Sequence, residues 1–285
     1  MKSPSLSVIL PNYNHGHMLG EMLEGIVSQS ILPQEVILVD DGSTDNSIEV
    51  IESYIQRAPF IKLYKNEINK GVLFSVNFAI QQASSDYLVF LSADDKIYSK
   101  FFEKSLAIIS DFPMAGVCCS DPAYFGSKEY AEHLGWSKNP HYFPPEEFVE
   151  VINGDYIRGH TSLVSRKAIL EVGGQLPELR WHCDWFALHV IAARYGVCYI
   201  PEPLALMRVG QETYSMSGRN DSDQQREVLT QLLRLLLSSK FNDVLPFFQK
   251  GKLMAHFGPE IVTLVIYSKE FWRKEVLDLI YSWIE

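Results

Sequence analysis

The chain has 285 residues, of which 47% are hydrophobic, and a formal net charge of −10 at pH 7. This length and composition predict a globular protein with one large α/β domain and an appendage. The acidic balance argues against general nucleic-acid binding, because a phosphate backbone favours a basic face, so we expect no nucleic-acid partner.

The first hundred residues alternate between predicted strands and predicted helices. We expect strands at 6–10, 36–39, 61–64 and 87–91, each a short apolar run. Helices are predicted at 18–30 and 72–83, and a further helix follows the capping residues Asp45, Asn46 and Ser47. This alternation predicts an α/β fold with a doubly wound, mostly parallel sheet. The glycine-rich motifs of dinucleotide-binding and P-loop proteins are absent from the sequence.

Two acidic pairs follow the second and fourth predicted strands. Asp40 and Asp41 end the run that begins at Val36, and Asp94 and Asp95 follow the run that begins at Tyr87. The carboxyl ends of parallel strands open into a common crevice, where ligands bind. Four carboxylates in one crevice repel each other unless a hard divalent cation joins them, and a nucleoside diphosphate supplies the remaining oxygens.

The second half of the chain is less regular. We expect a helix at 101–109, a strand at 115–119, an irregular insertion at 124–145, a helix beginning near Lys167 and a strand at 197–200. The insertion carries aromatic residues that either stack on a sugar face or close a hydrophobic core, namely Trp136, His141, Tyr142 and Phe143.

The pattern is helical from residue 221 onward. Leucines between 228 and 237 predict one strongly apolar helix, and residues 261–284 predict another. We expect these helices to pack or to form an oligomer contact. Membrane contact is the weaker interpretation, because Lys269, Arg273 and Lys274 are few and are offset by Glu275 and Asp278.

The four cysteines lack the C-x-x-C spacing of zinc and redox sites. We therefore expect buried, reduced thiols in a cytosolic protein. The first apolar run, Leu6 to Leu10, is too short for a signal peptide or a transmembrane segment, and no later run reaches the required length. The sequence predicts a soluble, cytoplasmic protein, and a position at the inner membrane surface is compatible with this.

Several motifs occur in the order and spacing of a known family. The first hundred positions resemble the nucleotide-binding half of family 2 glycosyltransferases with the A-type fold. The matching segments are Ser7–Asn14, Val39–Asp45, Asn69–Gly71 and Leu91–Asp95, and the resemblance continues through Gly173-Gly174, Trp181–Trp185 and Ile200–Leu204.

The resemblance implies an inverting, metal-dependent glycosyltransferase. Such an enzyme moves a sugar from a nucleotide-diphosphate donor, most commonly a uridine diphosphate sugar, to a saccharide or glycoconjugate acceptor in polysaccharide or glycoconjugate synthesis. It divides the chain into a nucleotide-sugar-binding half at 1–99, an acceptor-binding half at 100–220 and a C-terminal helical extension at 221–285.

The resemblance also assigns the nucleotide and metal sites. Asp41 is expected to read the base, and Asp94 and Asp95 to hold Mn²⁺ or Mg²⁺ against the diphosphate, with Asp94 also able to contact the ribose. The alternative for Asp40 and Asp41 is a turn and helix-cap role. Many relatives carry Asp where this chain has Ser92. The full set of expected nucleotide-binding residues is Pro11, Asn12, Tyr13, Asp41, Lys70 and Asp94.

An inverting transfer is a single displacement, which needs one base near the acceptor hydroxyl. Asp184 matches the position of the family's catalytic acid, although Cys183 replaces the usual preceding Glu. The alternative is a carboxylate that the dipole of a helix N-terminus favours.

Three further residues are candidates for contacts with the acceptor or the diphosphate, and each has a structural role as its alternative: His160, His182 and Arg208. His160 lies in a segment that also contains Asp155, Arg158 and Thr161. Gly210 stands where relatives have a His, and Arg219 is a second guanidinium near it.

Two other functions stay open. A nucleotidyltransferase also places acidic metal ligands at strand ends, but a glycine- and lysine-rich loop after the first strand is absent. A catalytically silent nucleotide-binding module fits the departures at Ser92, Cys183 and Gly210.

Overall fold

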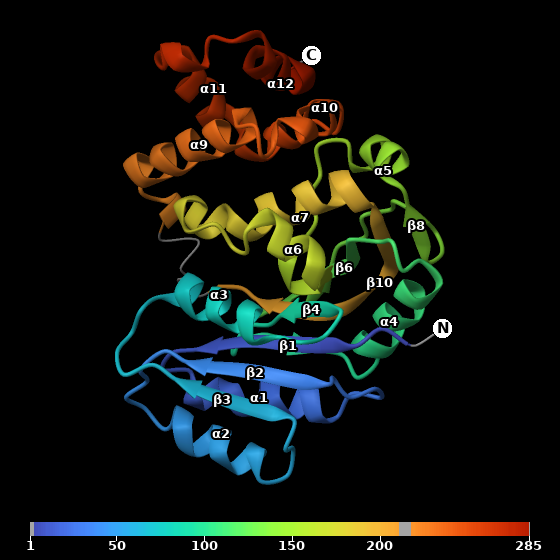
Figure 1. The fold of residues 1–285 in the computed structure, drawn as a ribbon, viewed down its shortest axis with the longest axis vertical. Coiled ribbons are helices and arrows are strands. Elements are labelled where there is room, and N and C mark those ends of the chain that lie inside the picture. Colours follow the sequence, from blue (N-terminus) through green and yellow to red (C-terminus); the bar gives the residue numbers. More distant parts are fainter. Residues whose placement is uncertain (1–2, 211–217, 285) are drawn as a thin grey trace.

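One sheet runs through the computed structural model, which describes residues 3–210 and 218–284 (Figure 1). Its strand order is β3-β2-β1-β4-β9-β6-β10-β5, with β7 paired to β6 and β8 paired to β10. Neighbours among the first four strands pair in parallel, and so do β6 and β10. Between these two parallel groups, β9 pairs antiparallel with both β4 and β6. The strands are β1 (Leu6–Asn12), β2 (Glu35–Asp40), β3 (Ile61–Lys65), β4 (Tyr87–Phe90), β5 (Lys96–Ile97), β6 (Val117–Phe125), β7 (Tyr130–Ala131), β8 (His141–Phe143), β9 (Ser162–Ser165) and β10 (Val197–Arg208).

Helices cover both faces of the sheet, which confirms the doubly wound α/β prediction. Along β1, Ile9 belongs to the core under α3, α6 and α7, whereas Val8 and Leu10 belong to the core under α1, α2 and α4. This alternation is the period of two that a strand imposes. The helices with described bounds are α1 (Gly16–Val27), α2 (Ser47–Ile55), α3 (Val72–Gln82), α4 (Phe101–Asp111), α5 (Pro145–Ile152), α6 (Arg166–Val172), α7 (Cys183–Tyr195), α9 (Ser222–Leu237), α10 (Leu245–Lys250), α11 (Gly258–Tyr267) and α12 (Lys274–Ile284).

The last strand is longer than its sequence pattern predicted. The expected end at Ile200 precedes Pro201 and Pro203, which usually stop a strand. In the structure β10 continues to Arg208, and its register against β6 shifts on both sides of Pro203. These irregularities accommodate the prolines and bring Arg208 beside Phe125 at the end of β6.

The predicted helix over 261–284 is wrong. The chain forms two helices there, because Ser268 is extended and a 3₁₀ turn at Lys269–Phe271 separates α11 from α12. Phe271 is buried in the break, and the Trp272 indole donates a hydrogen bond to the carbonyl of Val265.

The insertion at 124–145 is also more ordered than expected, since it contains β7 and β8.

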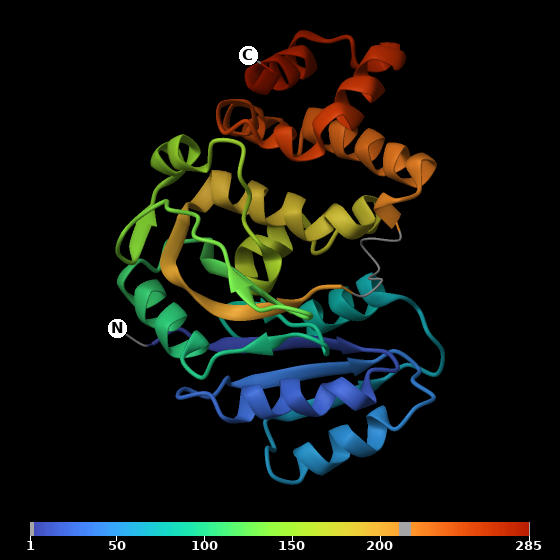
Figure 2. The same ribbon diagram turned by 180° about the vertical axis from the view of Figure 1, so that it is seen from behind.

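The C-terminal helices form a layer at one end of the molecule (Figure 2). Apolar residues of α9 belong to the same buried cluster as α7, so α9 has the packing role that its sequence predicted.

All four cysteines are buried and free, as expected. Within residues 3–210 and 218–284, every helix is too short or too polar to span a membrane.

Glu35, the first residue of β2, links this strand to β1, to β3 and to the turn before β4. It lies at the edge of the sheet opposite the carboxyl ends of these strands. Its carboxylate accepts hydrogen bonds from the Ser7 hydroxyl (2.8 Å), the Lys62 ammonium (2.6 Å) and both the amide and hydroxyl of Ser84 (2.8 Å each). These residues belong to β1, β3 and the turn before β4. Burial alone would raise the pKa of Glu35, but these hydrogen bonds outweigh it and lower the pKa to about 2.

We predict that Glu35→Gln lowers the free energy of unfolding by about 3 kcal/mol at neutral pH, which is the pKa shift expressed as energy. The folded-state pKa lies below the ordinary value of 4.5, so this stabilisation is present above pH 4.5 and is lost as the pH falls towards 2. Urea unfolding at pH 7 and pH 3 checks both points. The difference between variant and wild type should narrow at the lower pH.

Glu52→Gln is the matched control, because Glu52 pairs with Lys65 through side chains that are 57% and 49% exposed. An exposed pair contributes roughly 0–1 kcal/mol, so this variant should unfold close to wild type at both pH values. Equal effects of the two substitutions would contradict the role of Glu35.

Candidate active site

The carboxyl ends of β1 and β2 are joined by polar side chains. The Asn12 amide donates to Asp40 Oδ1 (2.8 Å), and Asp40 also accepts from the amide (3.0 Å) and hydroxyl (2.6 Å) of Ser43. The two bonds from Ser43 lie inside the turn after β2, and the bond from Asn12 crosses from the end of β1. Asp40 therefore has the turn role that was its alternative interpretation. Asp45 has a cap role, since it accepts from the amides of Gly16 and Ser47 at the starts of α1 and α2.

Asp41 holds the chain that approaches α3. Its carboxylate accepts from the Asn66 amide group (2.7 Å) and from the backbone amides of Lys70 (3.0 Å) and Gly71 (2.8 Å). A carboxylate has about four acceptor positions, so one stays available for a base edge. The structure thus places Asp41 in a turn role while leaving room for the predicted contact.

The other predicted nucleotide-binding residues lie around the same edge of the sheet. Pro11 pairs with Val39 inside the sheet, and Tyr13 follows β1 with its side chain 42% exposed. Lys70 is exposed and places its ammonium 4.7 Å from the centre of the Phe74 ring. These residues border the turn that Asp41 holds.

Asp94 and Asp95 lie in the turn that follows β4. Asp95 is buried, and its Oδ1 accepts a hydrogen bond from the backbone amide of Arg208 (2.8 Å) in β10. Among the described residues, the Arg208 guanidinium forms no hydrogen bond with either carboxylate. Its Nε donates to the Asp94 carbonyl (3.0 Å), and its cationic carbon lies 4.5 Å from the centre of the Phe125 ring. Arg208 therefore anchors the acidic turn.

The acidic turn suits a divalent cation. Burial, assisted by the neighbouring charge of Asp94, raises the pKa of Asp95 to about 7, and hydrogen bonds from Arg208 only partly oppose it. Within the part of the chain that the structure describes, no side-chain cation pairs with either of the two adjacent carboxylates of this turn. Among the described residues, a cluster of three or more metal-binding side chains is absent. Mg²⁺-type sites of this kind use one or two carboxylates and complete their shell with phosphate oxygens and water.

Asp184 lies in the first turn of α7, a helix that covers the same face of the sheet as α3 and α6. Its Oδ1 accepts a hydrogen bond from the Trp185 amide (2.7 Å), which is the helix-terminal arrangement expected as its alternative role. The other oxygen is not used in this cap. Burial raises the pKa of Asp184, and the Trp185 amide and the nearby Arg219 charge oppose that rise.

A 3₁₀ turn at Gly159–Thr161 (η1) lies against the free oxygen of Asp184. A Cβ atom on Gly159 would sit 2.6 Å from Asp184 Oδ2, so this close approach requires glycine. The same turn contacts β4, β6, β10 and α7. It therefore connects the helix that carries Asp184 with the strand that carries Arg208.

The two candidate histidines lie in different environments. His182 is buried, and its Nε2 lies 3.2 Å from Gln225 Oε1 in α9, so it belongs to the packing between η2 (Pro177–His182) and α9. Its position favours the structural alternative. His160 lies in η1 beside Gly159, and its Nε2 is buried without a hydrogen-bond partner. Burial, then the nearby Arg158 charge, lower the pKa of His160 to about 4, so the imidazole is neutral at pH 7.

The aromatic residues expected in the insertion mostly close the core. Trp136 is 8% exposed and packs on Phe148 and Tyr199. Phe143 is also buried, whereas Tyr142 stacks on Phe112.

Sequence reasoning did not single out Asp121, a buried acid within β6 that accepts hydrogen bonds from the Tyr199 hydroxyl (2.5 Å) and the Leu134 amide (3.1 Å). The signal for it was an acidic residue inside an apolar strand.

Curated relatives match about a third of the chain. An uncharacterized glycosyltransferase of Haemophilus influenzae is 38% identical over 106 residues, which cover 37% of this chain and 42% of that protein. The cholesterol galactosyltransferase of Borreliella burgdorferi is 33% identical over 98 residues, which cover 34% of this chain and 27% of that protein. The chain thus matches less than half of the length of each of these relatives.

Solved structures match nearly the whole chain. S. aureus TarS 1–349 in complex with UDP superimposes with a TM-score of 0.68 at 16% identity, covering 98% of this chain and 80% of that one. A mannosyltransferase from Pyrobaculum calidifontis, in complex with GDP-Man and Mn²⁺, gives a TM-score of 0.60 at 17% identity, covering 100% and 87%. These likenesses confirm the expected glycosyltransferase fold.

The remaining comparison concerns the family as a whole. The model of glycosyl transferase family 2 matches residues 7–173, which is more than half of the chain. The matched range contains Asp41, the acidic turn at Asp94 and Asp95, and the η1 turn. This chain belongs to glycosyl transferase family 2.

Proposed function

We propose that this protein is an inverting, metal-dependent glycosyltransferase. It takes a sugar from a nucleotide-diphosphate donor, with uridine diphosphate sugars as the first candidates, and transfers it to a hydroxyl of a saccharide or glycoconjugate. The observation that carries the proposal is the buried Asp95 beside Asp94, anchored to β10 at the carboxyl edge of the sheet. A nucleoside diphosphate bound at this edge would place its phosphates against that turn.

The proposed reaction needs one proton acceptor. Asp184 Oδ2 takes the proton of the acceptor hydroxyl as that oxygen attacks the anomeric carbon of the donor sugar. The bond between the anomeric carbon and the diphosphate oxygen breaks in the same step, so the configuration inverts and the nucleoside diphosphate leaves. Support for this role is the oxygen of Asp184 that the Trp185 hydrogen bond leaves unused, and the raised pKa of the buried carboxyl.

Asp94 and Asp95 are the residues that would hold a divalent cation. When bound, Mn²⁺ or Mg²⁺ supplies positive charge to the departing diphosphate without any proton transfer. Asp41 and Asn12 lie at the neighbouring strand ends and border the position proposed for the nucleoside. The mannosyltransferase that shares this fold was solved with Mn²⁺ and a nucleotide sugar, which supports the choice of ion to test first.

A role in polysaccharide or glycoconjugate synthesis follows from the names of relatives. They include a B. subtilis teichuronic acid biosynthesis glycosyltransferase, 32% identical over 108 residues, as well as the galactosyltransferase from B. burgdorferi. The first name refers to teichuronic acid biosynthesis, and the second refers to transfer of galactose to cholesterol.

We predict that Asp95→Asn weakens Mn²⁺-dependent binding of UDP by roughly ten-fold or more, because the amide removes a charge that the cation needs. Isothermal titration of UDP, with and without Mn²⁺, measures this effect. GDP is titrated in parallel, since the base is part of the proposal.

Asp86→Asn serves as the control for charge. Asp86 precedes the same strand at its opposite end, where its carboxylate accepts from Ser5. This variant should bind UDP and Mn²⁺ like the wild type. Metal-independent UDP binding in the wild type would contradict the metal assignment.

We predict that Asp184→Asn lowers the rate of donor turnover by roughly 10³-fold while UDP affinity changes by less than about two-fold. Asparagine keeps an oxygen for the Trp185 amide, so the start of α7 should stay intact. A screen of UDP-, GDP- and TDP-sugars for release of free nucleotide measures turnover.

Asp184→Glu is the companion variant, because it keeps the carboxylate charge and moves the carboxylate by the length of one methylene group. It should retain more activity than Asp184→Asn. An Asp184→Asn protein with full turnover would rule out Asp184 as the base.

A further inference from the structure

Three aromatic rings form a row that runs from β7 through β6 to η1. Tyr130 in β7 is 49% exposed and stacks on Tyr124 in β6, with ring centres 5.0 Å apart and an interplanar angle of 28°. Tyr124 is nearly buried, and its ring centre lies 5.8 Å from that of His160 in η1. The row thus leads from an exposed ring to the turn that lies against Asp184.

One end of this row lies beside the acidic turn. In the sheet, Tyr124 is in register with Met207, and Phe125 is in register with Arg208, whose amide holds Asp95. Lys96, the residue after Asp95, places its ammonium 4.7 Å from the centre of the Phe125 ring. The strand that carries Tyr124 is therefore directly attached to the proposed donor side of the site.

The other end lies beside the proposed base. Gly159 lies against Asp184 Oδ2, and His160 follows it in η1. Among residues 3–210 and 218–284, the buried Nε2 of His160 has no hydrogen-bond partner, and a buried polar atom of this kind normally has one. Because burial and Arg158 lower the pKa of His160, its ring is neutral at pH 7 and can accept a hydrogen bond from a hydroxyl.

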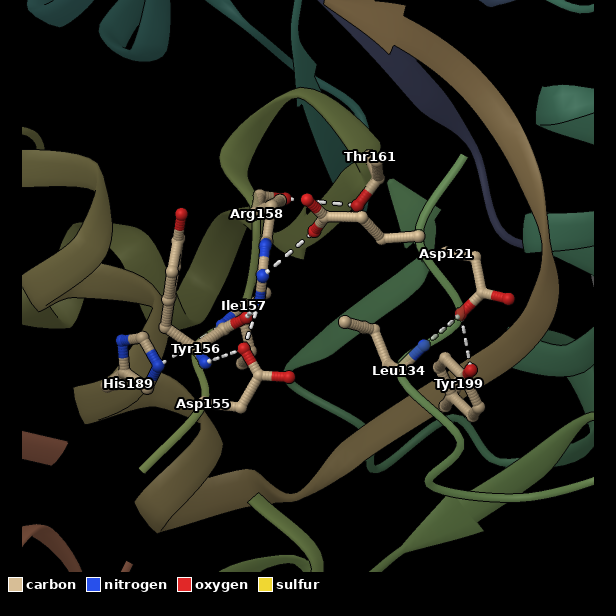
Figure 3. A network of polar contacts seen from close by, with 10 residues as sticks. Asp121, Leu134, Asp155, Tyr156, Ile157, Arg158, Thr161, His189 and Tyr199 are labelled. Atoms are coloured by element: carbon tan, nitrogen blue, oxygen red, sulfur yellow. Dashed lines mark hydrogen bonds and ion pairs between the residues drawn. The ribbon is translucent and has the colours of Figure 1, made fainter. Parts of the chain in front are cut away.

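Arg158 fixes the ring row relative to Asp184. Its guanidinium pairs with Asp155 and donates to Glu132 Oε2 (3.2 Å), just after β7, while its carbonyl accepts from the hydroxyls of Thr161 (3.1 Å) and Ser162 (2.7 Å). In Figure 3, dashed lines join the Arg158 guanidinium to Asp155 and its carbonyl to Thr161. One half-buried residue thus contacts both the β7 segment and the η1 turn.

A second anchor holds the chain after β7. The buried carboxylate of Asp121 accepts from the Leu134 amide and the Tyr199 hydroxyl, both drawn in Figure 3. Glu132, tied to Arg158, and Leu134, tied to Asp121, hold the chain on the C-terminal side of Tyr130, while the pairing of β7 with β6 holds Tyr130 itself to the sheet. An exposed ring held in this way is preorganised for a ligand.

We propose that Tyr130, Tyr124 and His160 form the acceptor subsite, and that it takes a pyranose ring whose apolar face stacks on Tyr130. The inference rests on the proposed function, since it is the acceptor hydroxyl that must lie between the acidic turn and Asp184. Arg158 acts as a positioning residue for this subsite. The class of ligand follows from the residues: an exposed aromatic ring, in a row that ends at a neutral hydrogen-bond acceptor, fits the mixed apolar and hydroxyl surface of a sugar.

The test uses Tyr130→Ala and Tyr130→Phe in the full chain, with methyl glycosides of glucose, galactose and N-acetylglucosamine as probes. Ligand-observed NMR in the presence of UDP and Mn²⁺ measures glycoside binding, and release of UDP from the donor measures turnover with and without glycoside. We expect Tyr130→Ala to weaken glycoside binding by roughly ten-fold and Tyr130→Phe to stay near wild type, because the ring face is the binding element. UDP binding and glycoside-free donor turnover should change by less than about two-fold in both variants.

The controls separate positioning from stability. Tyr267→Ala removes a tyrosine that is 75% exposed on α11 and should leave glycoside binding unchanged.

Arg158→Lys should weaken glycoside binding as well, since lysine cannot form the forked contacts of the arginine guanidinium. Arg194→Lys is its match, because Arg194 also binds a carboxylate (Asp243), a carbonyl (Lys240) and an aromatic ring (Phe241), yet it does so beneath the C-terminal helices. It should lower stability without weakening glycoside binding.

Two outcomes would overturn the inference. One is glycoside binding that is equal in wild type and Tyr130→Ala, including the case in which the wild type binds no glycoside. The other is an equal loss in Tyr130→Phe, which would mean that the hydroxyl and not the ring face is needed. Failure of the proposed function has a different signature, namely absent metal-dependent UDP binding and absent donor turnover in the wild type.

Discussion

The hydrogen bond from the Arg208 amide to Asp95 joins the two halves of this protein's site. It connects the turn after β4 with the end of β10, residues that are 113 positions apart in the chain. The contact exists only because β9 runs antiparallel between the two parallel groups of strands and so gives β4 and β10 the same direction. Their carboxyl ends then reach the same edge of the sheet. The bulges around Pro203 give β10 the extra length that this requires.

The number of donors around each carboxylate separates supporting residues from reactive ones. Asp40 and Asp41 each accept hydrogen bonds from the turn that they hold, and Glu35 does the same at the far edge of the sheet. Asp95 and Asp184 are buried or half-buried with raised pKa values, because they have fewer donors than desolvation demands. A buried carboxyl with few hydrogen-bond donors favours binding of a cation or a proton. Such groups are typical of functional sites.

The sequence predicted the first half of the fold well, because β1 to β4 are short apolar runs and the helices between them have clear apolar faces. It failed where tertiary contacts decide the local structure. The break between α11 and α12 depends on Phe271 entering the core, and β10 extends past two prolines because β6 supports it. β9 was not predicted, since its four residues carry little pattern of their own. Among the residues of the proposed site, the acidic turn and Asp184 were predicted from residue type and position. The ring row was not, because Tyr124 and Tyr130 become neighbours only through the pairing of β6 with β7.

The distribution of aromatic residues shows why sequence alone could not distinguish a binding ring from a core ring. Trp136 and Phe143 come from the same insertion as Tyr130. Trp136 and Phe143 face Phe148 and the apolar cluster beneath α5 and α7, whereas Tyr130 is exposed on β7. Asp121 and Arg158, two charged residues on either side of the insertion, bind Leu134 and Glu132 just after Tyr130. Contacts between residues far apart in the chain therefore decide which of these rings enters the core and which is left for the proposed ligand.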